Sequence, residues 1–293
     1  AINSVYGLTS ANFKNAFRDT RNKDNIVAKR GALFMIDLKN EVQKRGFTVA
    51  HIKTDSIKIP DATPEIIQFV MDFGKRYGYT FEHEATYDRM CLVNDAVYIA
   101  KYDNGEWTAT GAQFAVPYVF KTLFSHEPIV FNDLCQTFAV SKGDLYLDRN
   151  EGYPDVSILE NELDKLETKY KKGLISDTVF ENTCAEKDYI NQIAKGHEYQ
   201  FVGRVGQFTP IKSGCNGGIL YRFSGGKYYA APGSTGYRWL ESENVKGTDL
   251  ENHIDTSYYV SLANDAIETI NHFGKFEDFI NLDITPSFMI IPD

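Results

Sequence analysis

The 293-residue sequence has no apolar run long enough to cross a bilayer, and its first residues lack the basic-then-apolar pattern of a signal peptide. We therefore expect a cytoplasmic protein that has no membrane partner. Cysteines are few and far apart, and none stands in ligand spacing with a histidine; they are Cys91, Cys135, Cys184 and Cys215. Free thiols are the expectation, and nothing in the spacing favours a metal site built from them.

The glycine-rich stretches lack the common nucleotide-binding patterns. Neither GRVGQF nor GCNGGI fits GxGxxG between a strand and a helix, or the Walker spacing that ends in GK and Ser or Thr. Tight hairpin turns account for these glycines more simply. The aromatic and basic residues around them are expected to be mostly core, with stacking on nucleic-acid bases as the alternative.

Net charge is −9, which for the chain as a whole disfavours binding to a polyanion. The charge is unevenly distributed, however, because residues 1–60 hold eleven Lys and Arg against five Asp and Glu. A basic first part joined to an acidic remainder is typical of a protein that meets a phosphate backbone with one face. Ordinary variation in surface charge is the alternative.

Periodicity and stop signals predict the elements of the first third. Residues 25–45 have helical spacing and end before Gly46, and Pro64 opens a second helix that closes near Gly78. Between them, FTVAHI and IKI predict a hairpin with Asp55 at its tip. Strands are then predicted for YTFEHEA, CLVNDAVYIAKY and WTATG. This order favours an α+β fold, with an antiparallel sheet covered by helices on one face.

The character of the sequence changes near residue 113. PYVFKTLF precedes a loop rich in Gly and Asp, and ENELDKLETKYKKG predicts a solvated helix. Residues 199–240 predict a small β unit, and SYYVSLANDAIETINHFGKFEDFI predicts further helix. We therefore divide the chain into residues 1–112 and a mixed helical part, 113–293, that contains the β unit.

Two motifs point to a family when they are taken together. The chain opens on NSVYG, and the predicted hairpin holds TDS. In this order, with a long helix between them, they resemble the family B, or alpha-type, DNA polymerases, and most closely the shorter members encoded by bacteriophages. That family has Asn-Ser-x-Tyr-Gly in a fingers helix and Asp-Thr-Asp-Ser in a palm hairpin. The matching residues are Asn3, Ser4, Tyr6, Gly7, Thr54, Asp55 and Ser56.

The resemblance implies a fold and an activity. Residues 1–112 would be the end of the fingers helix and the palm, and residues 113–293 the thumb. The activity would be DNA-directed DNA synthesis on a primer-template with deoxynucleoside triphosphates. Two Mg²⁺ ions, or Mn²⁺ in their place, would be held by carboxylates. A turn-forming aspartate is the ordinary interpretation of a lone TDS, but the joint order of both motifs favours Asp55 as catalytic residue and metal ligand.

Other residues take roles from the same resemblance. Glu84 stands where family members carry a palm glutamate near the ions, and Tyr98 matches the tyrosine of an element that holds the primer strand. Asn94 and Asp95, or their neighbours, stand where that element has lysines, so Lys101 is the candidate for the missing charge, with an ordinary lysine at a strand end as the alternative. The residues expected to contact nucleotide or primer-template are Asn3, Tyr6, Gly7, Lys53, Thr54, Ser56, Tyr98 and Lys101. A helix-packing aromatic is the alternative for Tyr6.

The sequence also departs from the family. Lys53 replaces the first Asp of Asp-Thr-Asp-Ser, and the fingers lysine, the exonuclease domain and the first palm motif with its own Asp would all precede Ala1. We therefore expect a C-terminal polymerase part that is inactive without an N-terminal fragment or subunit. The first alternative is a non-catalytic DNA-binding or interaction subunit with a polymerase-like palm. A nucleotidyl transferase or cyclase of another lineage is the second.

Overall fold

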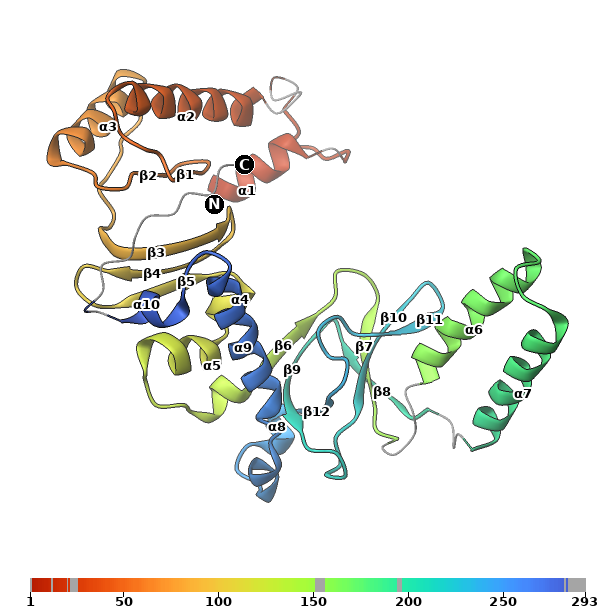
Figure 1. Cartoon of the computed structure of the whole chain (residues 1–293). Helices are drawn as coiled ribbons and strands as arrows, with labels where there is room; N and C mark the ends of the chain where they lie inside the picture. Colours follow the sequence, from red (N-terminus) through yellow and green to blue (C-terminus); the bar gives the residue numbers. More distant parts are fainter. Residues whose placement is uncertain are drawn as a thin grey trace. The chain divides into compact units, whose positions relative to one another are not determined.

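The computed structural model describes residues 2–11, 13–19, 21, 26–150, 156–193, 197–281 and 283. For the helical residues 2–5, 156–162 and 187–193 it describes the backbone alone. The chain forms two compact units, one of residues 1–110 with 273–293 and the other of residues 111–272 (Figure 1). The predicted division at residue 112 lies beside the first of these boundaries, whereas the segment after residue 272 groups with the first unit.

The first unit begins with three helices and a short hairpin. Helix α1 is Ile2–Ser10, α2 is Ile26–Lys44 and α3 is Pro64–Arg76, while β1 (His51–Ile52) and β2 (Ile57–Lys58) pair antiparallel. Helices α2 and α3 pack face to face through Met35, Leu38, Val42, Ile66, Val70 and Phe73, all buried. Because these residues recur at three- and four-residue spacing, each helix presents one apolar stripe to this core.

Gly46 and Gly78 follow the two long helices with positive φ angles, +86° and +79°. Glycine adopts this left-handed conformation without the steric penalty that a Cβ brings, which explains why the helices end where the sequence predicts.

A three-stranded antiparallel sheet completes the first unit. Its order is β3-β4-β5, with β3 at Tyr87–Asn94, β4 at Val97–Tyr102 and β5 at Trp107–Thr110. Helix α10 (Phe276–Ile280) reaches this sheet from the end of the chain, since the Phe279 ring lies 5.7 Å from that of Trp107.

The second unit holds two antiparallel sheets. One has the order β11-β10-β7-β8 and the other β12-β9-β6. The strands are β6 (Gln136–Ala139), β7 (Asp144–Asp148), β8 (Tyr199–Gly203), β9 (Val205–Ile211), β10 (Ile219–Ser224), β11 (Lys227–Ala230) and β12 (Arg238–Glu241). Their core is formed by Leu145, Leu147, Phe208, Leu220 and Trp239, and Tyr258 and Tyr259 complete it.

Helices and short helical turns precede, separate and follow these strands in the sequence. Short turns at α4 (Ala112–Ala115), α5 (Pro117–Phe120), a π-helical turn (Lys121–Ser125) and a 3₁₀ turn (Phe131–Leu134) precede β6. Helices α6 (Val156–Lys171) and α7 (Asp177–Ile193) follow β7 and precede β8 in the sequence, and they lie side by side (Figure 1). After β12 come α8 (Ser242–Val245), a 3₁₀ turn (Asp249–His253) and α9 (Ser257–Asn271), and α9 contacts α4 and α5.

The α+β class with antiparallel sheets is confirmed. Three local predictions were wrong. YTFEHEA forms no strand, CLVNDAVYIAKY is a hairpin of β3 and β4 instead of one strand, and the Gly- and Asp-rich segment contains β6 and β7. The β unit therefore includes strands from before residue 199. In the part of the chain that the structure describes, no helix has the length and apolar character that crossing a membrane requires.

Candidate functional site: the hairpin tip

Asp55 projects from the tip of the β1–β2 hairpin. Lys53, Thr54 and Asp55 are exposed and Ser56 is half-buried. The Lys53 amide donates to the Ser56 carbonyl at 2.9 Å and closes the turn. Among the residues that the structure describes, none forms an ion pair or hydrogen bond with the Asp55 carboxylate. Its oxygens are therefore available to a cation or a donor from outside.

The strands of this hairpin are short, but apolar contacts fix them. Ile52 and Ile57 form a cross-strand pair and pack against the core that α2 and α3 share. An isolated two-stranded hairpin is marginally stable in water, so this packing explains its persistence with only two residues in each strand. The tip is thus an exposed turn, and the two strands that carry it are held by apolar contacts.

Tyr98 lies beside the hairpin. It belongs to β4, where it pairs with Leu92 and Thr110, and the Lys58 ammonium lies 5.3 Å from the centre of its ring. Lys58 is on β2, three residues after Asp55. A lysine over a tyrosine ring is held by cation–π attraction, so Lys58 brings a positive charge to Tyr98 that the sequence near Asn94 lacks.

Glu84 lies close to a cluster of tyrosines in the same unit. Burial, then the neighbouring Tyr98 and Tyr102, raise the pKa of Tyr87, and the charge of Glu84 adds a smaller effect in the same direction. The Tyr87 and Tyr102 rings stack with their centres 5.2 Å apart. Glu84 itself is exposed in the irregular segment before β3.

The predicted metal ligands do not form a metal site by themselves. Across the described ranges, no group of three or more His, Cys, Asp or Glu side chains is arranged to hold an ion. A pair of divalent ions needs bridging carboxylates, and the hairpin tip contributes one, from Asp55. The residues present therefore do not fit two ions without further ligands.

Lys101 is separated from Tyr98 by the geometry of β4. Lys101 pairs with Arg89 and Trp107, three residues along the strand from Tyr98. Because successive side chains alternate between the two faces of a strand, an odd separation places these two on opposite faces. Lys58, which the sequence did not single out, is the lysine that accompanies Tyr98.

Helix α1 carries the other predicted contacts. Tyr6 is 40% exposed, and its carbonyl accepts hydrogen bonds from the Thr9 and Ser10 hydroxyls. A Cβ added at Gly7 would meet nothing within 4 Å, so the described chain itself does not require a glycine there. Asn3 lies in α1, but its side chain is outside the described residues.

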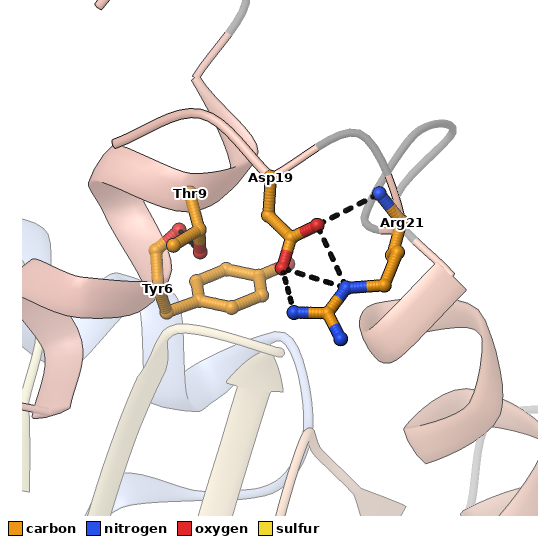
Figure 2. A network of polar contacts seen from close by, with 4 residues as sticks. All are labelled: Tyr6, Thr9, Asp19 and Arg21. Atoms are coloured by element: carbon orange, nitrogen blue, oxygen red, sulfur yellow. Dashed lines mark hydrogen bonds and ion pairs between the residues drawn. The ribbon is translucent and has the colours of Figure 1, made fainter. Parts of the chain in front are cut away.

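A turn after α1 places an arginine near this helix. The Asp19 amide donates to the Thr9 carbonyl at 3.2 Å, and the Asp19 carboxylate binds the Arg21 guanidinium at 2.8 Å (Figure 2). This ion pair lowers the pKa of Asp19, mainly through the side-chain hydrogen bond from Arg21. Arg21 remains 90% exposed, so most of its surface is open to an anion.

His51, like Lys58, was not singled out from the sequence. It is buried on β1 directly opposite Lys58, and neither ring nitrogen has a hydrogen-bond partner among the described residues. A signal was available, because a turn closed at Lys53 and Ser56 pairs residue 51 with residue 58 by simple counting.

No protein-family model matches the chain, and no curated protein matches its sequence significantly. The functional interpretation therefore rests on the motif residues and on the geometry around the hairpin.

Proposed function

We propose that this chain is the C-terminal part of a DNA-directed DNA polymerase, in which Asp55 supplies one of the carboxylates for nucleotidyl transfer to a primer 3′ hydroxyl. The observation that carries the proposal is the exposed Asp55 at the tip of a hairpin held by apolar contacts, whose carboxylate has no partner among the described residues. Lys58 of the same hairpin lies over the Tyr98 ring. The order of NSVYG and TDS along the chain agrees with this assignment.

The chain acts together with a further polypeptide part. Phosphoryl transfer to a hydroxyl by two divalent ions needs carboxylates that bridge them, and the tip provides Asp55 with Lys53 in place of a second acid. The other carboxylate must then come from an N-terminal fragment or subunit. Mg²⁺ is the expected metal, with Mn²⁺ as a substitute, and both would bind only in the assembled protein.

This chain's own residues have three tasks in that assembly. Asp55 supplies a fixed carboxylate, since the closed turn holds its backbone. Tyr98 and Lys58 lie along the primer strand, and exposed cations of residues 1–60, Arg21 among them, contact phosphates. Tyr6 and Gly7 line the nascent base pair from α1.

A primer-extension assay tests the proposal. The chain is assayed alone and mixed with the polypeptide from the same genome that carries the family's first palm motif, with Mg²⁺ and all four nucleotides. We expect synthesis only in the mixture. Asp55→Asn should lower it at least about 100-fold, because even loss of an outer-shell partner of a metal costs 10- to 100-fold.

Asp61→Asn is the matched control. Asp61 is exposed, follows the same hairpin and has a φ of +49°, a conformation that asparagine adopts as readily as aspartate. It changes charge by the same amount without touching the tip. Incorporation by the chain alone, or equal activity of both variants in the mixture, would contradict the proposal.

One observation favours a second candidate, a non-catalytic subunit with a polymerase-like palm. Lys53 puts a cation next to Asp55, and no cluster of three ligands exists in the described part of the chain. Under this alternative the two parts associate and bind DNA, yet the mixture neither extends a primer nor gains Mn²⁺ affinity. Reverting Lys53→Asp would then restore metal binding.

A further inference from the structure

His51 is buried, but its imidazole has no hydrogen-bond partner among the described residues. Its side chain is 7% exposed, and both ring nitrogens are without a hydrogen bond in the described part of the chain. Asp95 Oδ1 lies 3.6 Å from Nε2, which is beyond hydrogen-bond length. Buried polar groups in proteins are normally satisfied, so a ligand that brings an acceptor to Nε2 would explain this histidine.

Two lysines lie near His51. Lys58 pairs directly with His51 in the β1–β2 ladder, so their side chains project from the same face of the hairpin. Lys53 is two residues further along the same segment. Both charges act on the imidazole: its pKa is lowered first by burial and then by Lys58, with a smaller contribution from Lys53, and Asp95 opposes this shift without cancelling it. Three potential donors therefore lie near a position that the Asp95 carboxylate approaches from the β3–β4 turn.

Tyr98 fixes one of these donors. Its ring lies under the Lys58 ammonium at 5.3 Å, which keeps the charge beside the hairpin instead of extended into solvent. An oxyanion next to Nε2 would receive charge-assisted hydrogen bonds from ammonium groups and one from the imidazole.

Among the described residues, Asp95 is the acid that forms an ion-pair contact with His51, and it stands where such an anion would bind. It lies in the turn between β3 and β4, and its side chain is 94% exposed. The turn is closed by its neighbours, since the Ala96 amide donates to the Asn94 side chain at 2.9 Å. The Asp95 carboxylate is therefore not needed by the turn and can rotate into solvent at little cost.

We propose that His51, Lys58 and Lys53 form a phosphate-binding site, and that the Asp95 carboxylate occupies this site until a phosphate group displaces it. The phosphate belongs either to the backbone of the primer strand or to a free nucleotide or pyrophosphate. This inference deepens the proposed function and rests on it for the source of the phosphate.

The test measures binding without metal ions and without synthesis. Inorganic pyrophosphate and a primer-template duplex are titrated separately into the 293-residue chain, and dissociation constants are compared among variants. Lys58→Gln should weaken binding about tenfold, the usual effect of losing a hydrogen bond to a charged group. Asp95→Asn should strengthen it about threefold, because an exposed charge is largely screened.

Two variants on α3 control for net charge. Lys75→Gln removes one positive charge and Asp72→Asn one negative charge, and the two exposed side chains contact each other at 3.5 Å. An effect on the duplex alone assigns the site to the DNA backbone, and an effect on both probes assigns it to free phosphates as well. Hairpin variants that behave like their α3 controls with both probes would overturn the proposal.

A measurement on the unmodified chain covers the case in which a variant does not fold. The ring ¹⁵N shifts of His51 are followed by NMR during titration with pyrophosphate and with the duplex. A saturable shift with either probe is expected, and no shift with both would overturn the site. If the mixture extends a primer but the chain binds neither probe at His51, the phosphate site is rejected and the proposed polymerase function is retained. If the chain binds a probe there but the mixture does not extend a primer, the polymerase function is rejected and the phosphate site is retained.

Discussion

The Arg89 guanidinium donates a 2.9 Å hydrogen bond to the backbone carbonyl of Phe279, 190 residues further along the chain. A second bond, 2.8 Å long, reaches the Asn281 carbonyl, and Asp88 pairs with the same side chain at 2.8 Å. Arg89 is 6% exposed and lies on β3. This contact accounts for the grouping of the last segment with the first unit, because it satisfies carbonyls that α10 leaves unpaired at its end.

Arg89→Met should detach this segment. Methionine fills similar space but donates nothing, so two carbonyls lose their partner and the first unit loses about 2–4 kcal/mol of stability. Hydrogen exchange should speed up selectively in residues 276–281. Each unit contains one tryptophan, Trp107 and Trp239, and the two indole NMR signals in urea report on the units separately.

Arg76→Met is the control for this experiment. Arg76 is exposed at the end of α3 and has no recorded partner among the described residues. If both variants shift the Trp107 transition equally, or if exchange in residues 276–281 is unchanged, the proposed role of Arg89 is wrong.

Gly143→Ala should weaken the second unit through steric contact. Gly143 has a φ of +76°, and a Cβ there would overlap the Phe223 carbonyl oxygen at the end of β10. The left-handed conformation alone costs an alanine about 1 kcal/mol. The overlap with backbone adds to it, because β10 must shift, and we expect a total loss of about 3 kcal/mol in the Trp239 transition.

Gly225→Ala separates the two contributions. Gly225 also has a positive φ, +62°, in the turn between β10 and β11, but a Cβ there would meet nothing within 4 Å. It should cost only the conformational part. Equal losses for the two variants would mean that contact with Phe223 has no energetic consequence.

The sequence predicted those elements whose signals are local. The helices that became α2 and α3 were found because their apolar stripes and terminal glycines lie within one segment. Strands β6 and β7 were missed because their partners, β8, β9 and β10, are more than 50 residues further along the chain, and a strand of four or five residues has little pattern of its own.

The geometry of the candidate site was predictable to a similar extent. The hairpin with Asp55 at its tip followed from turn and strand signals, but Lys58 beside Tyr98 depends on how the hairpin meets β4. Lys101 was chosen for nearness in sequence, and strand alternation places it on the other face. Arg89 could not be assigned, since its partners are backbone carbonyls at the far end of the chain and leave no trace in residue type.

Stability of the first unit should fall below about pH 6.5 because of His51. Burial and the charges of Lys58 and Lys53 lower its pKa in the folded state, against an opposing effect of Asp95. As the pH falls through the ordinary histidine pKa, the unfolded chain therefore takes up a proton on this side chain. The folded chain does not bind that proton in the same pH range. Unfolding is favoured over that window, and stability rises again with pH until His51 is neutral in both states.

Urea titrations at about pH 7.5 and pH 5.5, followed at the Trp107 indole, check this window. His51→Gln should make the transition less dependent on pH. His272→Gln is the control, because His272 is exposed and belongs to the second unit. An unchanged slope in His51→Gln would mean that other groups cause the pH dependence.

Asp148 should stabilise the base of the α6–α7 hairpin, by which we mean the point where the chain leaves β7 toward helices α6 and α7 and returns to β8. Its side chain is 5% exposed; Oδ2 binds His197 Nδ1 at 2.7 Å, and Oδ1 accepts from the Glu198 amide at 3.0 Å and the Asn150 amide at 3.2 Å. The chain leaves the sheet after Asp148 and returns at its ladder partner Tyr199. One carboxylate thus binds both the outgoing and the returning strand.

Asp148→Ala removes all three bonds and leaves two amides without this acceptor. We therefore expect the free energy of unfolding that is followed at Trp239 to fall by about 2–4 kcal/mol, and amide hydrogen exchange in β8 to become faster. Asp144→Ala is the matched control: Asp144 lies four residues away on the same face of β7, and no bond to its carboxylate is recorded in the described part of the chain. Because β7 also pairs with β10, whose inner face lies in the core, the sheet itself should survive both substitutions. If Asp148→Ala opened β10 as much as β8, the carboxylate would be supporting the whole sheet, and its assignment to the base of the α6–α7 hairpin would be wrong.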